Sequence, residues 1–169
     1  PFARGWTFRG QEIPGVITDL NVGLLFVLAL SSIGVYGVAL GGWASNSKFS
    51  LLGAIRGAAQ MISYELSLGL SLVPVVMLAR SFSLVDIVEA QARFPFILFQ
   101  PLAFLLFFTS AVAEMKRIPF DIPEAENELV AGFHTEYSSM GFAAFFMAEY
   151  SNIVTVCCVA TVLFFGGWH

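Results

Sequence analysis

The stretch NVGLLFVLALSSIGVYGVALGGW, residues 21–43, runs for 23 positions without a charged side chain. A transmembrane helix needs ~20 mostly apolar residues to cross a hydrocarbon core of ~30 Å. Gly34, Gly37 and Gly41 add the small-residue spacing that lets helices pack closely in lipid. The stretch therefore predicts a membrane-spanning helix.

Three further stretches have the same character. They cover about residues 51–79, 96–113 and 137–165, and Pro74 is expected to bend the first of these three. Hydrophobic residues make up 57% of the chain and its mean hydropathy is +0.80, whereas soluble domains hold ~45–50%. We therefore predict an all-α integral membrane protein, with about four transmembrane helices in a single membrane domain over residues 1–169.

The segments between the spans are polar. In residues 80–94, an apolar spacing that includes Leu84, Ile87 and Val88 is compatible with a short surface helix. If the spans alternate in direction, four basic residues fall on each side of the membrane, so the positive-inside rule leaves the orientation open. The first side carries Lys48, Arg56, Lys116 and Arg117, and the second carries Arg4, Arg9, Arg80 and Arg93.

Several classes of site have no support in the sequence. The net charge of −4 argues against a nucleic-acid-binding protein. Cys157 and Cys158 are adjacent within an apolar stretch, which favours small buried residues over a metal site or a disulfide framework. The sequence has no glycine-rich phosphate loop and no HExxH motif. We therefore expect no metal site and no redox centre in this chain, and any redox cofactors in other subunits.

Three glutamates lie within or at the edge of the predicted spans. At ~1.5 Å rise per residue, Glu65 is ~21 Å from the start of its span and Glu149 is ~18 Å from the start of its own. Glu114 lies at the end of the third span. Carboxyl groups at membrane depth usually mark ion or proton paths. The alternative is a neutral, hydrogen-bonded glutamate that only holds helices together; Tyr64 and Tyr150, beside two of these residues, fit either interpretation.

The loop of residues 114–136 is strongly acidic. Asp121 is placed as an N-cap, Pro123 in the first turn and Glu124 three residues after the cap, which predicts a short helix that stops near Gly132. Glu124 and Glu126 are also compatible with a purely structural role, since the helix dipole stabilises acids in a first turn. Asp121, Glu124 and Glu128 share one helix face, whereas Glu126 points away.

These acids predict a negatively charged vestibule that leads to the mid-span glutamates. Arg117 is the nearest cation in the sequence. His134 can titrate near neutral pH, but one histidine in a loop is more often a hydrogen-bonding surface residue than a proton carrier.

Two long motifs resemble one known family. AEMKRIPFDIPEAENELVAGFHTEYSSMGFAAFFMAEY, residues 113–150, and GWASNSKFSLLGAIRGAAQMISYELSLGL, residues 42–70, are similar to the quinone-site membrane subunit of respiratory complex I. This is the H-type subunit of NADH:quinone oxidoreductase, equivalent to the mitochondrially encoded subunit 1. The resemblance covers essentially the whole chain. Because the chain starts at Pro1 and stops after an apolar run, we expect a central fragment of that subunit.

The resemblance implies roles for particular residues. The carboxyl groups implied in proton transfer are those of Glu65, Glu114, Glu149, Glu124, Glu126 and Glu128. The residues implied at the quinone-cavity wall are Arg117, Phe120 and Asp121. Lys116 departs from the family pattern, in which a neutral polar residue is frequent at this position. Its charge leaves open whether the electrostatic field at Glu114 is the one that the resemblance implies.

The resemblance also implies the setting of the protein. The acidic loop would face the cytoplasm or matrix, quinone would be the substrate, and the flavin and iron–sulfur clusters would belong to partner subunits. The partners would be other complex I membrane subunits and the hydrophilic subunits of the quinone module, in a bacterial inner membrane rather than a mitochondrial one.

Three alternatives remain at this stage. A homologous subunit of a membrane-bound hydrogenase, or of another electron-input dehydrogenase, would share the same scaffold. A stand-alone proton-coupled carrier should show inverted repeats and interrupted helices, which the sequence does not reveal. A purely structural anchor does not account for the mid-span glutamates.

Overall fold

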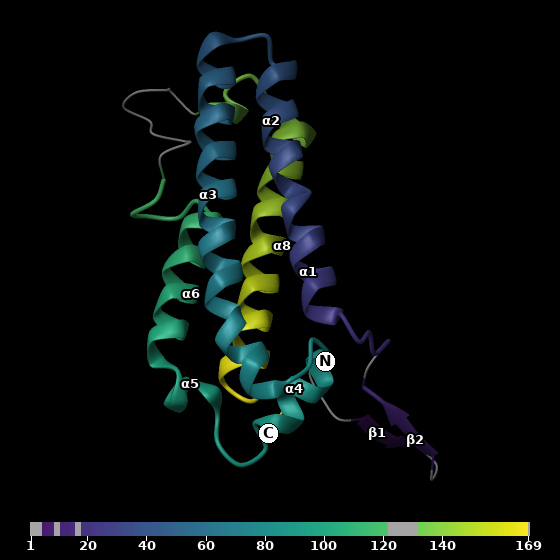
Figure 1. Ribbon diagram of the computed structural model, residues 1–169. Coiled ribbons are helices and arrows are strands. Elements are labelled where there is room, and N and C mark those ends of the chain that lie inside the picture. Colours follow the sequence, from purple (N-terminus) through teal and green to yellow (C-terminus); the bar gives the residue numbers. More distant parts are fainter. Residues whose placement is uncertain (1–4, 9–10, 16–17, 122–131, 169) are drawn as a thin grey trace.

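The computed structural model describes residues 5–8, 11–15, 18–121 and 132–168. The chain forms a bundle of long helices that run along one common direction (Figure 1). The helices of the bundle are α1 (Gly23–Ser32), α2 (Gly34–Ala44), α3 (Lys48–Ala79), α6 (Pro101–Glu114) and α8 (Ser139–Phe164). The remaining helical elements are α4 (Leu84–Ala90), α5 (Phe96–Phe99) and η1 (Gly132–His134).

The described helices confirm an all-α membrane fold. Three helical segments are long and apolar enough to cross a membrane by length and composition, namely Gly23–Ala44, Lys48–Ala79 and Ser139–Phe164. The apolar helix α6 is shorter, with 14 residues. Large apolar side chains on α3, such as Leu66, Leu70 and Met77, are about 70% exposed. This outward apolar surface suits a lipid environment, which is itself apolar.

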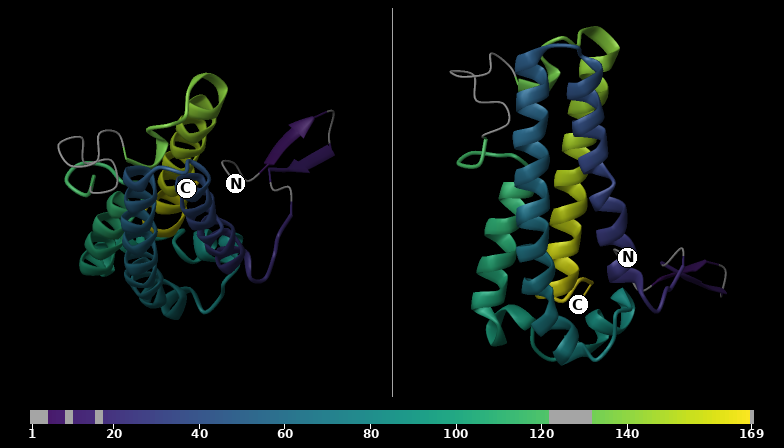
Figure 2. Two further views of the ribbon diagram at one scale, coloured as in Figure 1. Left: turned by 90° about the horizontal axis from the view of Figure 1, so that it is seen from above. Right: turned by 45° about the horizontal axis from the view of Figure 1, so that its top comes forward.

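A small hairpin precedes the bundle and was not predicted. Strands β1 (Gly5–Phe8) and β2 (Gln11–Pro14) pair antiparallel, with Gly5 opposite Pro14 and Phe8 opposite Gln11. The hairpin stands to the side of the helices in both views of Figure 2. It therefore adds a short β element to an otherwise helical chain.

The third predicted span is not one continuous helix. A break at Gln100 separates α5 from α6, and Gln100 has non-helical backbone angles of φ −134° and ψ 57°. Pro101 follows directly at the first position of α6. Proline disfavours helical geometry in the residue before it but fits the first turn of a helix. The bundle helix therefore begins at Pro101, five residues later than the sequence suggested.

The connection between α3 and α6 contains the predicted short helix. Ser83 caps α4, because its hydroxyl accepts hydrogen bonds from the backbone N–H groups of Val85 and Asp86 at 3.2 and 3.5 Å. Ile87 and Val88 on this helix are fully buried, whereas Asp86 and Glu89 are exposed, so α4 is a surface helix that packs its apolar face against the bundle, as predicted.

One end of the bundle, beside α4 and α5, contains the main core. The buried side chains of this core come from helices far apart in the sequence, and include Leu68, Leu72, Val75, Ile87, Phe107, Leu163 and Phe164. Gln91 adds a polar link, since its amide donates to the Val162 carbonyl at 2.9 Å. This packed end fixes α3, α6 and α8 relative to one another.

The opposite half holds only a smaller core of Val38, Ala54 and Met61. Gly42 of α2 lies directly against α3, where an added Cβ would overlap the Ala54 methyl and lie 2.7 Å from the Ser50 carbonyl oxygen. Of the three glycines predicted to allow close packing, Gly41 meets the Phe145 ring, whereas Gly37 has no such neighbour within 4 Å. Close packing therefore centres on Gly41 and Gly42.

Candidate functional site

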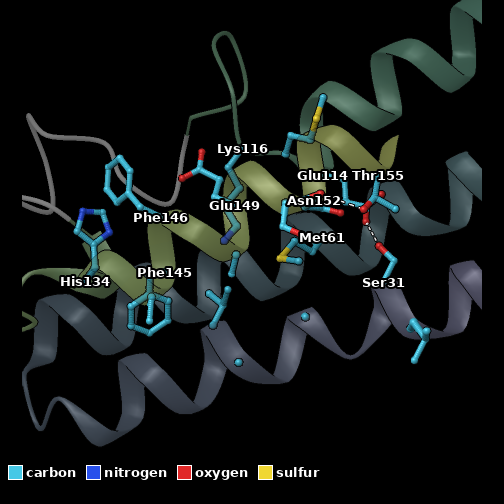
Figure 3. A pocket seen from close by; sticks show the side chains of 18 of the residues that line it. Ser31, Met61, Glu114, Lys116, His134, Phe145, Phe146, Glu149, Asn152 and Thr155 are labelled. Atoms are coloured by element: carbon cyan, nitrogen blue, oxygen red, sulfur yellow. Dashed lines mark hydrogen bonds between the residues drawn. The ribbon is translucent and has the colours of Figure 1, made fainter. Parts of the chain in front are cut away.

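A cavity of about 700 Å³ lies in this less densely packed half of the bundle. It is bounded by α1 and α2, by the end of α6 with the residues that follow, and by the first half of α8 (Figure 3). Most of its wall is apolar. The titratable side chains in the wall are those of Glu114, Lys116, His134 and Glu149. A mainly apolar cavity with a few polar groups is the usual form of a binding or transfer site.

Glu114 is the last residue of α6 and only 8% of it is exposed. Its Oε1 accepts a hydrogen bond of 2.7 Å from the Ser31 hydroxyl of α1, drawn as the dashed line in Figure 3. A buried carboxyl needs such a partner, because leaving it without one costs several kcal/mol. The bond joins residues 83 positions apart.

Glu65 is held in the same manner by the next serine. The Ser32 hydroxyl contacts Oε1 of Glu65, and it also lies 3.0 Å from the Leu28 carbonyl oxygen of its own helix. Glu65 is half-buried on α3 and is not among the residues that line the cavity. Two adjacent hydroxyls on α1 thus contact two of the predicted proton-transfer carboxyl groups.

The sequence analysis missed this serine pair. A signal was available, since Ser31 and Ser32 are adjacent polar residues in the middle of the uncharged stretch 21–43. Serine is common in transmembrane helices, however, and its hydroxyl can bond to its own backbone. Only the packing of α1 against α3 and α6 distinguishes these hydroxyls from ordinary ones.

Glu149 has a different partner. Nη2 of Arg117 lies 3.1 Å from its Oε1, and the two side chains are 45% and 22% exposed respectively. The Arg117 guanidinium also stands 5.4 Å from the centre of the Tyr150 ring. The cation that neutralises Glu149 thus comes from outside the spans, from the segment that follows α6. Helix α6 ends at Glu114, so Arg117, three residues later, lies beyond the helix and its side chain reaches Glu149 on α8.

Phe120 is anchored to α3. The Gln60 amide donates to the carbonyl oxygens of Ala113 and Phe120, each at 2.7 Å, and the Tyr64 and Phe120 rings meet edge to face at 5.3 Å. Non-helical backbone at membrane depth is tolerated where protein groups satisfy it. Gln60, which the sequence analysis did not single out, holds both ends of the segment between α6 and Phe120.

The residues implied at the quinone-cavity wall are not among those that line this cavity. Its lining includes Met115 and Lys116 but not Arg117, Phe120 or Asp121. Arg117 approaches it through Glu149. Glu124, Glu126 and Glu128, together with the short helix predicted around them, lie outside the described residues.

His134 lines the cavity from η1. Its ring packs against Phe142 at 5.4 Å and Phe146 at 6.4 Å. Burial lowers the pKa of the His134 imidazole below its ordinary value; Glu149 and Asp121 act against this shift, and Lys116 reinforces it. The ring is therefore neutral at pH 7.

The family model described as NADH dehydrogenase matches residues 1–169. The chain belongs to the NADH dehydrogenase family. A family model over the whole chain agrees with the two sequence motifs.

Three curated relatives of this NADH dehydrogenase family member come from bacteria. It is 70% identical to H subunit 2 of the NADH-quinone oxidoreductase of Syntrophobacter fumaroxidans and 67% identical to H subunit 1 of the Geobacter metallireducens enzyme. It is 60% identical to the H subunit of the Syntrophotalea carbinolica enzyme. Each match covers all of this chain and 51% of the relative. The chain thus spans about half the length of the curated relatives it matches.

Proposed function

We propose that this chain is part of the H-type membrane subunit of a proton-pumping NADH:quinone oxidoreductase in a bacterial inner membrane. In this role it contributes to the quinone cavity and to the carboxyl path that couples quinone reduction to proton translocation. It belongs to an enzyme complex but holds no redox centre itself, and the flavin and iron–sulfur clusters reside in partner subunits.

The observation that carries the proposal is the burial of Glu114 against Ser31 in the wall of a cavity that also reaches Glu149. Burying a carboxyl group in an apolar bundle costs free energy, so a carboxyl group found there usually marks an ion or proton path. Here two such groups line one cavity and a third, Glu65, is joined to the same α1 helix through Ser32. Groups arranged in this way can exchange protons across the bundle.

Arg117 extends this arrangement toward the acidic loop. In the proposal Arg117, Phe120 and Asp121 contribute to the quinone-cavity wall, which neighbouring subunits complete. Reduction of quinone changes the charge near the loop and shifts protons on Glu124, Glu126 and Glu128. The change then passes through the Arg117–Glu149 ion pair to the cavity, and onward to Glu114 and Glu65.

The runner-up is the homologous subunit of a membrane-bound hydrogenase or another electron-input dehydrogenase. The curated relatives cited above are all named as H subunits of NADH-quinone oxidoreductase, which favours NADH as the source of electrons. The carrier alternative loses its basis, because the chain belongs to the NADH dehydrogenase family.

Glu114→Gln in the full-length protein tests the proposal, because glutamine keeps the shape of the side chain and removes its proton exchange. In the assembled complex, we expect quinone-linked NADH oxidation and proton pumping to fall about tenfold or more. NADH oxidation by an artificial acceptor upstream of quinone should stay near the wild-type rate. Wild-type pumping in the assembled variant would remove Glu114 from the path.

A further inference from the structure

Ser31 and Ser32 connect two carboxyl groups from different helices. Ser31 bonds to Glu114 of α6, and Ser32 bonds to Glu65 of α3. The serines are the last two residues of α1, directly before the one-residue interruption at Ile33 that separates α1 from α2. The proposed function uses both carboxyl groups, and these adjacent serines are the contacts that join them through α1.

The Ser32 hydroxyl has two acceptors within reach, the Leu28 carbonyl oxygen and Oε1 of Glu65. A serine hydroxyl carries one hydrogen, so it can donate to only one of them at a time, whereas its oxygen can also accept. Both contacts are hydrogen bonds at once only when Glu65 is protonated and donates to Ser32 while Ser32 donates to Leu28. When Glu65 is ionised, Ser32 donates to Glu65 and gives up the bond to Leu28.

The backbone beside the serines is not a regular α-helix. The N–H group of Tyr36 bonds to the Ile33 carbonyl at 3.1 Å, a contact between residues three apart. Tight turns of this kind inside a helical segment often mark a place where the segment changes shape. A change of hydrogen-bond partner at Ser32 therefore acts next to a deformable junction, and on the residue covalently joined to Ser31.

We propose that Ser31 and Ser32 are positioning residues that couple the proton occupancy of Glu65 to that of Glu114 through the α1–α2 junction. The inference rests on the proposed function, whose proton path it deepens. Only hydrogen bonds change partners in this scheme. Protonation of Glu65 turns the Ser32 hydroxyl toward Leu28, the end of α1 adjusts, and the Ser31 contact with Glu114 changes in response.

Other charges around the cavity make an overall pH profile ambiguous. The cavity is lined by Lys116 after α6, by His134 before α8 and by Glu149 on α8. Arg117 forms an ion pair with Glu149. Asp121 acts electrostatically on His134. Each of these groups contributes to the pH dependence of turnover. The test must therefore report on Glu65 and Glu114 separately.

Infrared difference spectra of the assembled complex, recorded for a pH step, provide that separation. The carboxyl band that disappears in Glu65→Gln belongs to Glu65, and the band that disappears in Glu114→Gln belongs to Glu114. We expect Ser32→Ala to shift both bands, although Ser32 contacts only the first carboxyl. Ser32→Thr keeps the hydroxyl and should leave the Glu114 band in place.

Ser63→Ala is the matched control. Ser63 lies on α3 two residues before Glu65, is exposed, and donates to the Ala59 carbonyl of its own helix at 2.7 Å. This substitution removes the same hydroxyl group from the same neighbourhood and should shift neither band.

A Ser32→Ala complex in which the Glu65 band moves and the Glu114 band does not would overturn the coupling. If Ser32→Ala does not assemble, Ser31→Ala makes the same test from the other side, and an unmoved Glu65 band would be equally decisive. Failure of the proposed function has a different signature. Proton pumping would be normal in both Glu65→Gln and Glu114→Gln, whether or not the two carboxyl bands move together.

Discussion

Glu114 and Glu149 line one cavity, yet the protein holds them by different chemistry. Glu114 is 8% exposed and accepts a hydrogen bond from a neutral serine hydroxyl. The Glu149 side chain is 22% exposed and lies 3.1 Å from the guanidinium of Arg117, which is itself 45% exposed. The first carboxyl is thus in a dry, uncharged contact, and the second is in an ion pair that reaches the surface.

The difference has a consequence for proton exchange. A hydroxyl can donate to an ionised carboxylate and accept from a protonated carboxyl group, so the Ser31 contact can persist in both states. A guanidinium can only donate and carries a fixed positive charge, so the Arg117 contact is stronger with an ionised carboxylate than with a protonated carboxyl group. The serine side of the cavity therefore suits a group that gains and loses protons. The arginine side suits a group that senses charge.

The largest effect is expected from substitutions of the carboxyl groups themselves. Glu149→Gln should lower proton pumping about tenfold or more, since it removes a titratable group and leaves the Arg117 charge without this partner. Glu65→Gln should lower pumping less, because an amide can still accept from Ser32. Asp at either position keeps a carboxyl group and should be partly active.

Pumping and assembly, measured together for these four single variants, test this order. If both Gln variants assemble and pump normally while the Asp variants do not, the two glutamates act as structural links between helices. The hydroxyl side and the ion-paired side would then have no distinct roles in proton transfer.

A smaller effect is expected at Arg117. Arg117→Lys keeps the charge near Glu149 but loses the planar contact with the Tyr150 ring, and Arg117→Ala loses both. Quinone-linked turnover should therefore fall by several-fold in Arg117→Ala and by less in Arg117→Lys. Stability should change little, by roughly 1 kcal/mol or less, because the pair is partly exposed.

Equal loss of turnover in the two Arg117 variants, with assembly intact, would show that the charge is not what matters. The backbone or the packing of the segment after α6 would then be responsible. The ion-paired side of the cavity would lose its proposed role as a charge sensor.

The smallest effect is a pH dependence of stability at His134. Its pKa in the folded protein is lowered by burial, so as the pH falls below the ordinary value of about 6.5 the unfolded chain binds a proton before the folded one does. Stability from the neutral ring is present above that value and is lost on acidification toward the lowered pKa. The change should be small, because the ring is only half-buried.

Thermal unfolding of the purified complex at pH 7.5 and pH 5.5 measures this dependence, with His134→Gln as the comparison. The wild-type midpoint should decrease more on acidification than the midpoint of the variant. Identical decreases would assign the acid sensitivity to other groups.

Local sequence features predicted the extent of the helices well in residues 51–79 and 137–165, whereas the uncharged stretch 21–43 is interrupted at Ile33. The stretch ending at Ala79 is one helix from Lys48, and Pro74 lies within it. The prediction was less good where a single residue redirects the chain, as at Gln100, because the geometry imposed by Pro101 outweighs the apolar character of the flanking residues. The short surface helix predicted in residues 80–94 is present as α4, because the spacing of Leu84, Ile87 and Val88 gives it one apolar face.

The sequence by itself determined that this chain is a membrane protein of a known family with carboxyl groups at membrane depth. Apolar length, glutamate positions and motif residues are all local properties. Only the tertiary structure decided which partner each carboxyl group has. Ser31 meets Glu114 across 83 positions, and Arg117 reaches Glu149 because α6 ends at Glu114. A hydrogen bond or ion pair depends on how helices pack, and no local pattern specifies that contact.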